Sequence, residues 1–240
     1  MSPSPGEDTA AVGQFFNEQW TAYEKMLHHD LLGHRGLFDA ARGVLARHFA
    51  RSYALLDLGC GDARFSRRAV EGTSIARYVG IDLSEVALAG ARKNMADLAI
   101  ETAFELGNAF EPAAVAGTFD AVLASFSMHH LSEAQKGDFL TALRPRLSAD
   151  GVYLMIDLTR RDDETCESGV SRLTDHARRH WDVPHPGREW FKLKCHSSAH
   201  WSYWPVQRCC RRYGRTASPA GGWPAAGTFR IFGCSSRAPP

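Results

Sequence analysis

The sequence lacks any long uninterrupted apolar segment. No run reaches the roughly 18 apolar residues that a membrane-spanning helix requires, so we predict no membrane partner. The first ten residues, MSPSPGEDTA, contain neither a basic stretch nor an apolar one and do not have the composition of a signal peptide. Without export, the six cysteines are expected to be free thiols rather than a disulfide framework, and we expect a cytoplasmic location.

An excess of charge of one sign is also missing. The formal net charge is +1, so composition indicates neither a nucleic acid nor a membrane surface as a partner. Residues 1–170 carry 24 acidic and 16 Lys or Arg residues, whereas residues 171–240 carry 3 and 12. We therefore predict three segments, which are an N-terminal helical lid (1–50), a central domain (51–165) and an atypical, poorly ordered tail (166–240).

The tail has few aliphatic residues and neither a helical nor a strand period, so we predict no strands there and an unpaired edge on the preceding strand. The spacing of Cys195, Cys209 and Cys210 lacks the paired ligands of a zinc site, and no metal is predicted. Enrichment in Arg, Trp, Cys, Gly, Pro and Ser is typical of GC-rich DNA read out of frame. A frameshift after RLTDHARRHW therefore remains an open hypothesis.

Between the lid and the tail, short apolar segments alternate with segments of helical periodicity. The predicted strands cover residues 53–58, 77–82, 101–106, 119–124 and 151–157. Strands that each lead into a helix are typical of βαβ units. The predicted fold class is α/β, with a doubly wound, mostly parallel sheet, preceded by helices within residues 14–50 and followed by an irregular tail.

The stretch LLDLGCGDARF has the composition of a buried strand that enters a turn with little side-chain bulk. Gly59 and Gly61 let a ligand approach the main chain, and Asp82, which ends the next strand, can accept both hydroxyls of a ribose. A nicotinamide or flavin fingerprint needs a third glycine where Arg64 stands. A carboxylate at Asp57 would repel a pyrophosphate. The pattern favours an adenosine cofactor without phosphate and with positive charge, which describes S-adenosylmethionine.

Five motifs in order carry a resemblance to a known family. LLDLGCGDARF, YVGIDLS, ELGNAF, FDAVLASFSMHHL and LRPRLSADGVYLMIDLT resemble the motifs of class I S-adenosylmethionine-dependent methyltransferases over about residues 50–160. The resemblance implies a Rossmann-like fold and methyl transfer to a small-molecule acceptor. It also implies these cofactor contacts: Gly59, Cys60 and Gly61 at the methionine moiety with Asp57 nearby, Asp82 at the ribose, Leu83, Asn108 and Ala109 at the adenine, and Ser125 closing the pocket.

The acceptor side of the site is less defined. His129 follows the fourth predicted strand and is a candidate to take a proton from an acceptor hydroxyl or amine. Because methyl transfer from a sulfonium needs mainly alignment and desolvation, packing of His129 in the loop remains the alternative. The segment SFSMHH lacks the N-P-P-Y type motif of base or glutamine methylation. Two other functions stay open, namely a damaged relative that binds the cofactor without catalysis and a nicotinamide-dependent oxidoreductase.

Overall fold

The computed structural model describes residues 24, 27–30, 32–111, 116–158, 163–165, 167–169, 171–172, 175, 216–217 and 229–235. The main elements are, in chain order, α2 (His34–His48), β1 (Tyr53–Leu58), α3 (Arg64–Val70), β2 (Ile75–Asp82), α4 (Glu85–Met95), β3 (Glu101–Leu106), β4 (Phe119–Ser125), η2 (Met128–His130), α5 (Glu133–Leu143), η3 (Arg144–Arg146), β5 (Leu147–Leu158), β6 (Thr216–Ala217) and β7 (Phe229–Ser235).

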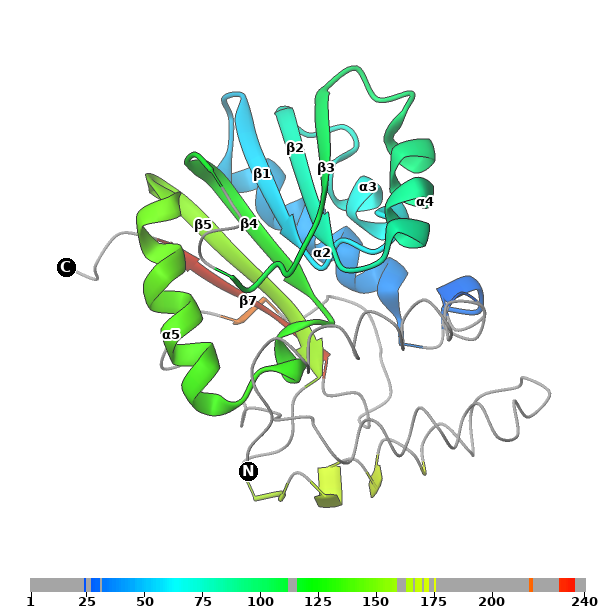
Figure 1. Ribbon diagram of the computed structural model, residues 1–240, viewed down its shortest axis with the longest axis vertical. Helices are drawn as coiled ribbons and strands as arrows, with labels where there is room; N and C mark the ends of the chain where they lie inside the picture. Colours follow the sequence, from blue (N-terminus) through cyan, green and yellow to red (C-terminus); the bar gives the residue numbers. More distant parts are fainter. Residues whose placement is uncertain are drawn as a thin grey trace.

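These strands form one sheet in the order β3-β2-β1-β4-β5-β7-β6 (Figure 1). The strands β1 to β5 are parallel, and the order reverses between β1 and β4. A reversal of this kind is where open parallel sheets bind ligands, outside the carboxyl ends of the strands. The predicted α/β fold class is confirmed. Strands β2 and β5 begin two and four residues earlier than predicted, at Ile75 and Leu147.

The prediction that the tail contributes no strands is wrong for two short segments. Strand β7 pairs antiparallel with β5, with Val152 opposite Ser235 and Leu158 opposite Phe229, so the edge of β5 is covered rather than open. The two-residue strand β6 pairs with β7 in turn. The remaining tail residues from 176 onward lie outside the described residues, as does most of the segment before residue 32.

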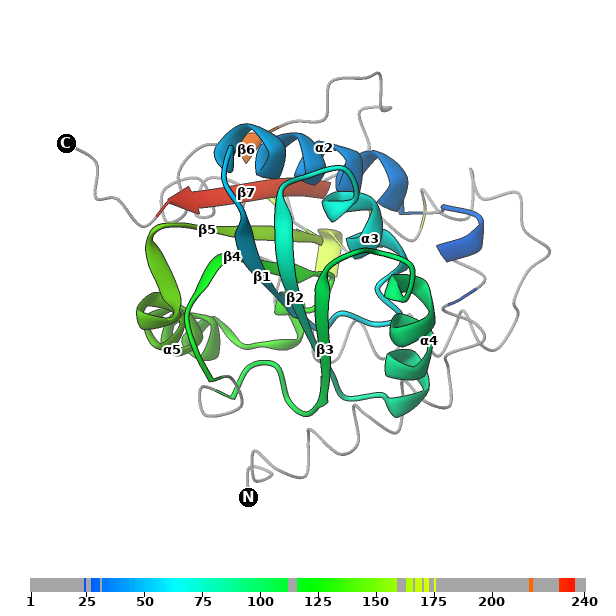
Figure 2. The same cartoon turned by 90° about the horizontal axis from the view of Figure 1, so that it is seen from above.

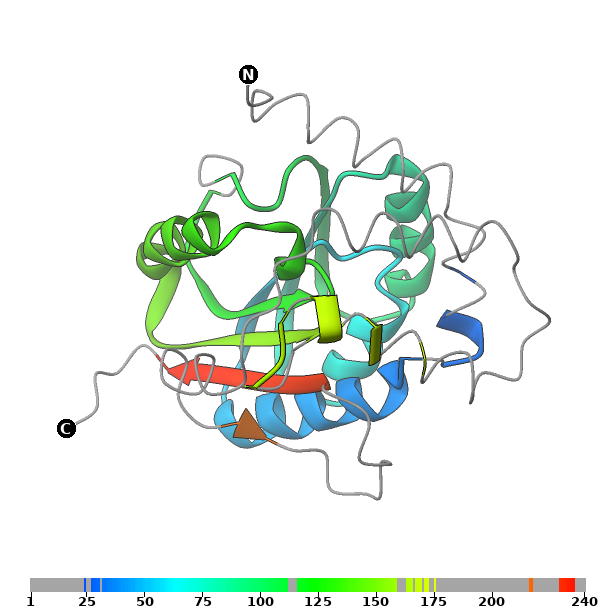
Figure 3. The same ribbon diagram turned by 90° about the horizontal axis from the view of Figure 1, so that it is seen from below.

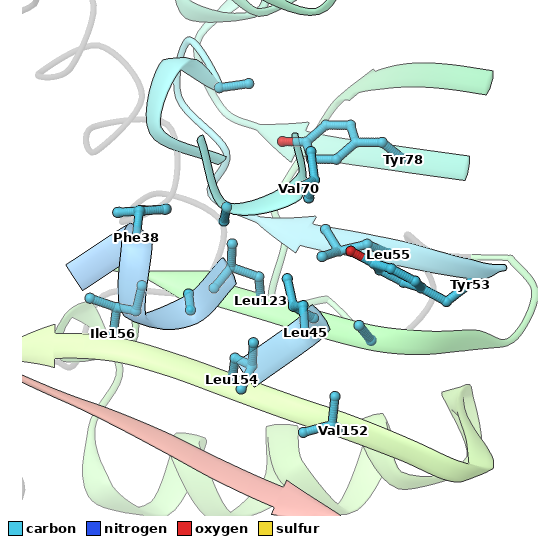
Figure 4. Packing of buried hydrophobic residues seen from close by; sticks show 14 of the residues in the cluster. Phe38, Leu45, Tyr53, Leu55, Val70, Tyr78, Leu123, Val152, Leu154 and Ile156 are labelled. Carbon is cyan, nitrogen blue, oxygen red and sulfur yellow. The ribbon is translucent and has the colours of Figure 1, made fainter. Parts of the chain in front are cut away.

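Helices cover both faces of the sheet. Figures 2 and 3 show α2, α3 and α4 on one face and α5 on the other. The first face is the larger, and its buried side chains come from α2, α3, α4 and the strands β1, β2, β4 and β5. Figure 4 shows part of this cluster. Tyr53, Leu55 and Asp57 alternate with Leu56 and Leu58 along β1, because successive side chains of a strand point to opposite faces.

The helix starts agree with local sequence signals. The hydroxyl oxygen of Ser84 accepts a hydrogen bond from the Ala87 N–H at the start of α4. Ser132 and Gln135 form a reciprocal capping box at the start of α5, as their spacing predicts. Helix α2 follows Gly33, whose φ of 72° is in the left-handed region that glycine tolerates.

Candidate active site

Hydrogen bonds join neighbouring strand ends along the carboxyl edge of the sheet. The Gly107 N–H donates to the carbonyl of Asp82, joining the turns after β3 and β2. The Gly61 N–H donates to Oδ2 of Asp82 over 2.8 Å, joining the turns after β1 and β2. Oγ of Ser127 donates to the Leu58 carbonyl over 3.1 Å, joining β4 to β1. These bonds connect the turns that follow β1, β2 and β3, and they connect the residue after β4 to the end of β1.

The glycine turn after β1 has the open geometry that the sequence predicts. Gly59 and Gly61 have φ values of 72° and 55°, a region that favours glycine. A Cβ at Gly59 would lie 3.0 Å from Cβ of Ser127, so this position faces protein. A Cβ at Gly61 would have no heavy atom within 4 Å, so this position faces open space. Gly61 therefore marks the part of the turn that a ligand can approach.

Cys60 lies between these glycines and is buried. A Cβ on Gly80 of β2 would lie 2.8 Å from the Cys60 Sγ, so glycine at position 80 is what makes room for the thiol. Burial raises the pKa of the Cys60 thiol well above its usual range, and the charges of Asp57 and Asp82 add to the shift. A thiol held in its neutral form is not a nucleophile, so Cys60 acts here as a packing residue.

Asp82 is half-buried and connects two turns through both carboxylate oxygens. Its Oδ1 accepts the Ser84 N–H over 2.9 Å, and its Oδ2 accepts the Gly61 N–H. Burial raises the pKa of Asp82, and the hydrogen bonds from Ser84 and Gly61 oppose that shift. Each carboxylate oxygen has two lone pairs, so these bonds still leave acceptor capacity for a ligand hydroxyl.

Asp57 has no exposed surface and lies beneath the glycine turn. The Tyr78 hydroxyl donates to its Oδ2 over 2.6 Å, and its Oδ1 has no hydrogen-bond partner among the residues that the structure describes. Burial raises the pKa of Asp57 to about 6, against the opposing effect of hydrogen bonds from Ser66 and Tyr78. Asp57 is therefore a buried carboxyl group two residues before Gly59, and it has no surface exposed to solvent.

The predicted adenine contacts follow β2 and β3. Leu83 is half-buried between Asp82 and the start of α4. The side-chain oxygen of Asn108 accepts the Phe110 N–H over 3.1 Å, which fixes a tight turn after β3. Ala109 is buried in the cluster beneath α5. The structure places these residues along the same edge as Asp82, and their adenine roles stay predictions.

The turn after β4 carries Ser125, which is predicted to close the cofactor pocket, and leads to His129, the candidate on the acceptor side. Ser125 ends β4 half-buried, and the next residue, Phe126, has a φ of 49°, which is strained for an aromatic residue. The Phe126 N–H donates to the Ile156 carbonyl over 2.7 Å, which fixes this conformation. The chain then enters η2, which contains His129 and follows β4 at the carboxyl edge of the sheet. Closure of the pocket by Ser125 stays a prediction.

His129 is buried against a carboxylate that the sequence reasoning missed. Its Nδ1 lies 2.6 Å from Oδ1 of Asp157, near the end of β5, and its backbone N–H donates to Oδ2 of the same residue over 3.0 Å. The two side chains are 5% and 4% exposed. An acid that ends a strand was the only available signal for Asp157, and the pairing with a residue 28 positions away appears only in the fold.

A second buried histidine packs nearby without polar partners. His34, at the first turn of α2, lies 4.8 Å from the Phe65 ring and 4.5 Å from the Phe126 ring, measured between centroids. Neither of its ring nitrogens has a hydrogen-bond partner in the described part of the chain. Burial lowers the pKa of His34 to about 3, so the imidazole is neutral. The His34 ring lies between Phe65, in the helix after the glycine turn, and Phe126, which directly follows β4.

Arg64 stands at the third position of the glycine pattern, and its contacts explain why an arginine is accommodated there. Its Nε donates to Oδ2 of Asp62 over 2.5 Å, and its side chain reaches Glu24 over 3.1 Å. The guanidinium therefore points away from the sheet toward the N-terminal segment. Asp62, which the sequence reasoning did not single out, is buried at this contact.

Two kinds of feature are missing from the described part of the chain. It contains no group of three or more His, Cys, Asp or Glu side chains arranged to hold a metal ion. Cys195, Cys209 and Cys210, the tail cysteines considered for zinc, lie outside the described residues. Among the described helices, none combines the length and apolar character needed to cross a membrane.

Comparison with known proteins agrees with this geometry. A family model for a methyltransferase domain matches residues 55–151, and no curated protein sequence matches the chain. Magnesium protoporphyrin IX methyltransferase from Synechocystis PCC 6803, solved with bound SAH, is 14% identical with a TM-score of 0.62, over 94% of this chain and 98% of that one. The DhpI-SAM-HEP complex is 14% identical with a TM-score of 0.61, over 97% and 99%.

The cyclopropane synthase MmaA2 from Mycobacterium tuberculosis is 20% identical with a TM-score of 0.52, over 76% of this chain and 62% of that one. This chain thus spans less than two thirds of the synthase. At these identities the structural similarity shows a shared fold, and the family-model match covers the glycine turn, Asp82 and the β4 turn. Residues 55–151 therefore match a methyltransferase domain, and they lie in a fold that is shared with methyltransferases of known structure.

Proposed function

We propose that the protein transfers the methyl group of S-adenosylmethionine to a small-molecule acceptor. The observation that carries the proposal is the open cradle at Gly61, with a carboxylate, Asp82, hydrogen-bonded to its N–H. A ribose placed against Asp82 would meet its remaining lone pairs, and the rest of the cofactor would cross the bare turn. S-adenosylmethionine supplies an electrophilic methyl group when bound there.

The charges around the turn support a cationic, phosphate-free ligand. Asp57 and Asp82 lie at the ends of neighbouring strands, and Oδ1 of Asp57 is a buried oxygen without a partner in the described region. Carboxylates in these places favour an ammonium or sulfonium group and disfavour a pyrophosphate. The same charges argue against a nicotinamide dinucleotide. We propose a small acceptor and no nucleic-acid substrate, and the fold shared with magnesium protoporphyrin IX methyltransferase supports an acceptor of this kind.

A matched pair of glycine variants tests the cofactor site. Gly61 and Gly72 both have positive φ values, 55° and 75°, and a Cβ at either position would meet no heavy atom within 4 Å. Substitution by alanine at either position should therefore lower the free energy of unfolding by a similar amount, about 1 kcal/mol, because of backbone strain. Only Gly61→Ala places a methyl group in the proposed cradle, whereas Gly72 lies in the turn before β2.

Calorimetry of the full chain with S-adenosylhomocysteine, S-adenosylmethionine and NAD provides the measurement. We expect the two sulfur ligands to bind, NAD not to bind, Gly61→Ala to weaken binding at least about tenfold, and Gly72→Ala to leave it within about twofold. Binding of NAD alone, or equal effects of the two substitutions, would overturn the proposal. Tight binding without transfer of a labelled methyl group to any acceptor would favour the inactive relative.

The proposed catalytic residue is His129. It follows β4 at the carboxyl edge, two residues after Ser127, whose Oγ bonds to the strand that leads into the glycine turn. An acceptor bound between these two turns would lie beside both the cofactor and the histidine. This placement supports a role in accepting a proton from the acceptor.

A further inference from the structure

The imidazole of His34 is a buried polar group in an apolar setting. The residue is 2% exposed, and neither ring nitrogen has a hydrogen-bond partner among the described residues. The rings of Phe65 and Phe126 lie against it with interplanar angles of 23° and 39°, and the Phe38 ring lies 6.4 Å away between centroids. Phenyl rings offer no partner to a ring nitrogen. Because buried polar groups are nearly always hydrogen-bonded, the unpaired imidazole indicates a partner from outside the chain.

The direction of α2 places this imidazole at the carboxyl edge of the sheet. His34 is the first residue of the helix and lies beside Phe126, which directly follows β4. His48 is the last residue, and its Nε2 lies 2.8 Å from the carbonyl oxygen of Asp150, near the start of β5. The helix therefore runs opposite to the parallel strands, and its N-terminus is at the edge where the glycine turn lies.

The N-terminus of α2 favours a negatively charged partner. The first N–H groups of a helix have no carbonyl partner within it, and the helix dipole places positive charge there. The N-cap residue is Gly33, which has no side chain to cap the helix, and the first turn contains no acid. Oδ1 of Asp30 accepts the Arg35 N–H over 3.0 Å, which satisfies one of these groups. The first turn and the imidazole together suit a carboxylate.

The glycine turn lacks such a donor of its own. Asp57, Asp62 and Asp82 all lie at or beside it, and they disfavour a carboxylate. The guanidinium of Arg64 is already bonded to Asp62 over 2.5 Å and to Glu24 over 3.1 Å. The amino-acid end of S-adenosylmethionine carries an ammonium group, which these acids favour, and a carboxylate, which needs a donor elsewhere on the same edge.

We propose that His34, together with the first turn of α2, binds the carboxylate at the amino-acid end of S-adenosylmethionine through the N–H of its imidazole. A neutral imidazole has one N–H to donate, and a carboxylate has only acceptors, so the two groups match. This inference rests on the proposed function and orients the cofactor, with the ribose at Asp82 and the amino-acid end toward α2. It gives a role to a buried residue that the motif pattern leaves unassigned.

Two ligands that differ only in the carboxylate test the proposal. Calorimetry of the full chain compares S-adenosylhomocysteine with its decarboxylated analogue, S-adenosyl-3-thiopropylamine, which keeps the adenosine, the sulfur and the amino group. We expect the parent protein to bind S-adenosylhomocysteine about 10–100-fold more tightly, as a hydrogen bond to a charged acceptor predicts. H34F keeps the ring contacts without an N–H. It should lose this preference and leave the affinity for the analogue within about twofold.

His48, at the other end of the same helix, supplies the matched control. H48F should leave the affinities for both ligands within about twofold of the parent, and H34Q, which retains an N–H donor, should restore part of the preference. Equal affinities of the parent for the two ligands would overturn the proposal. An equal loss of both ligands in H34F would overturn it as well, because it would show that His34 serves only the packing of α2.

A spectroscopic measurement on the parent protein does not depend on the stability of H34F. The full chain is labelled with ¹⁵N in its histidines, and the His34 ring signals are assigned from H34Q. We expect S-adenosylhomocysteine to shift these signals and the decarboxylated analogue to leave them in place. Signals that respond equally to the two ligands, or to neither, would overturn the role of His34.

The two levels of proposal fail separately. If neither ligand binds, the cofactor site itself is wrong. If both ligands bind with the same affinity, the cofactor site stands and only the assignment of the carboxylate to His34 fails.

Discussion

The hydroxyl of Tyr78 lies 2.6 Å from Oδ2 of Asp57, and both side chains are buried beneath the glycine turn. The carboxyl group is thus at the end of a buried strand, where water cannot stabilise its charge, and burial raises its pKa to about 6. Burial likewise raises the pKa of Tyr78 well above its usual range, so its hydroxyl remains the hydrogen donor. The pair couples the stability of the fold to the protonation of a predicted site residue.

We predict that Asp57→Asn stabilises the fold and weakens cofactor binding. A folded-state pKa raised above the unfolded value means that the stabilising contribution is fully present below about pH 4 and is lost as pH rises through about 6. At pH 7 the neutral amide should therefore increase the free energy of unfolding by about 1–3 kcal/mol. Urea denaturation across pH 4–8 measures this. A variant whose advantage over the parent does not grow between pH 4 and 6 contradicts the prediction.

His34 should give the opposite pH dependence. Its pKa is lowered to about 3 in the fold, so the unfolded chain binds a proton that the folded chain does not, and stability falls as pH drops below about 6.5. His34→Phe keeps the ring contacts with Phe65 and Phe126 and removes the titration. Its advantage over the parent should grow by about 1.4 kcal/mol for each pH unit between about 6.5 and 3. A difference that stays constant with pH would show that the imidazole does not remain neutral in the fold.

Asp82→Ala should produce the largest loss of cofactor affinity. Two hydrogen bonds from a ribose to an ionised acceptor are worth about 1.5–3 kcal/mol each, so S-adenosylhomocysteine should bind about 10²–10⁴-fold more weakly. Asp82→Asn retains one acceptor oxygen and should have an intermediate effect. Calorimetry on both variants gives the values.

The structure adds a necessary control for this substitution, because Asp82 also accepts two backbone N–H groups. Ser84→Ala removes the hydroxyl that caps α4 at Ala87 and destabilises the same turn without touching the proposed ribose contact. Its affinity should stay close to that of the parent. An Asp82→Ala affinity within about threefold of the parent would mean that the ribose assignment is wrong.

Limited proteolysis should divide the chain after β5. The composition of the tail predicts that cleavage begins beyond about residue 170, while residues 50–160 resist. The pairing of β7 with β5 adds that the peptide containing residues 229–235 stays associated with the core after the cut. Gel filtration of the cleaved protein, followed by mass spectrometry, shows whether this peptide elutes with the core. A tail as resistant as the central domain would contradict the predicted cleavage beyond residue 170. Early loss of the peptide with residues 229–235 would contradict its predicted association with the core.

The glycine turn and Asp82 could be predicted from the sequence because their relation is local. A buried strand, two glycines and an acid at the end of the next strand lie within a short stretch, and the fold class follows from the alternation of strands and helices. Gly80 could not be predicted in the same way. Its closeness to Cys60 depends on the register in which Asp57 of β1 pairs with Gly80 of β2, which no local pattern specifies.

The same reason explains the missed acid and the missed strand. Asp157 ends a strand as many acids do, and only the adjacency of β4 and β5 brings it to His129. Strand β7 lies in a segment of low aliphatic content, and the sequence prediction judged that segment by composition. A strand can form there because β5 presents a ladder of backbone groups, so the partner rather than the local sequence specifies the pairing.

The β5–β7 ladder has a consequence for biosynthesis. Seventy residues separate Leu158 from Phe229, and a ribosome adding about 5–20 residues each second needs about 4–14 s to make them. During that interval all the parallel strands have been synthesised, but the backbone groups on the β7 side of β5 are still unpaired. The unpaired β5 edges of neighbouring nascent chains on one messenger RNA could then pair with each other. Conditions that slow translation should therefore lower the yield of monomer more than conditions that slow folding.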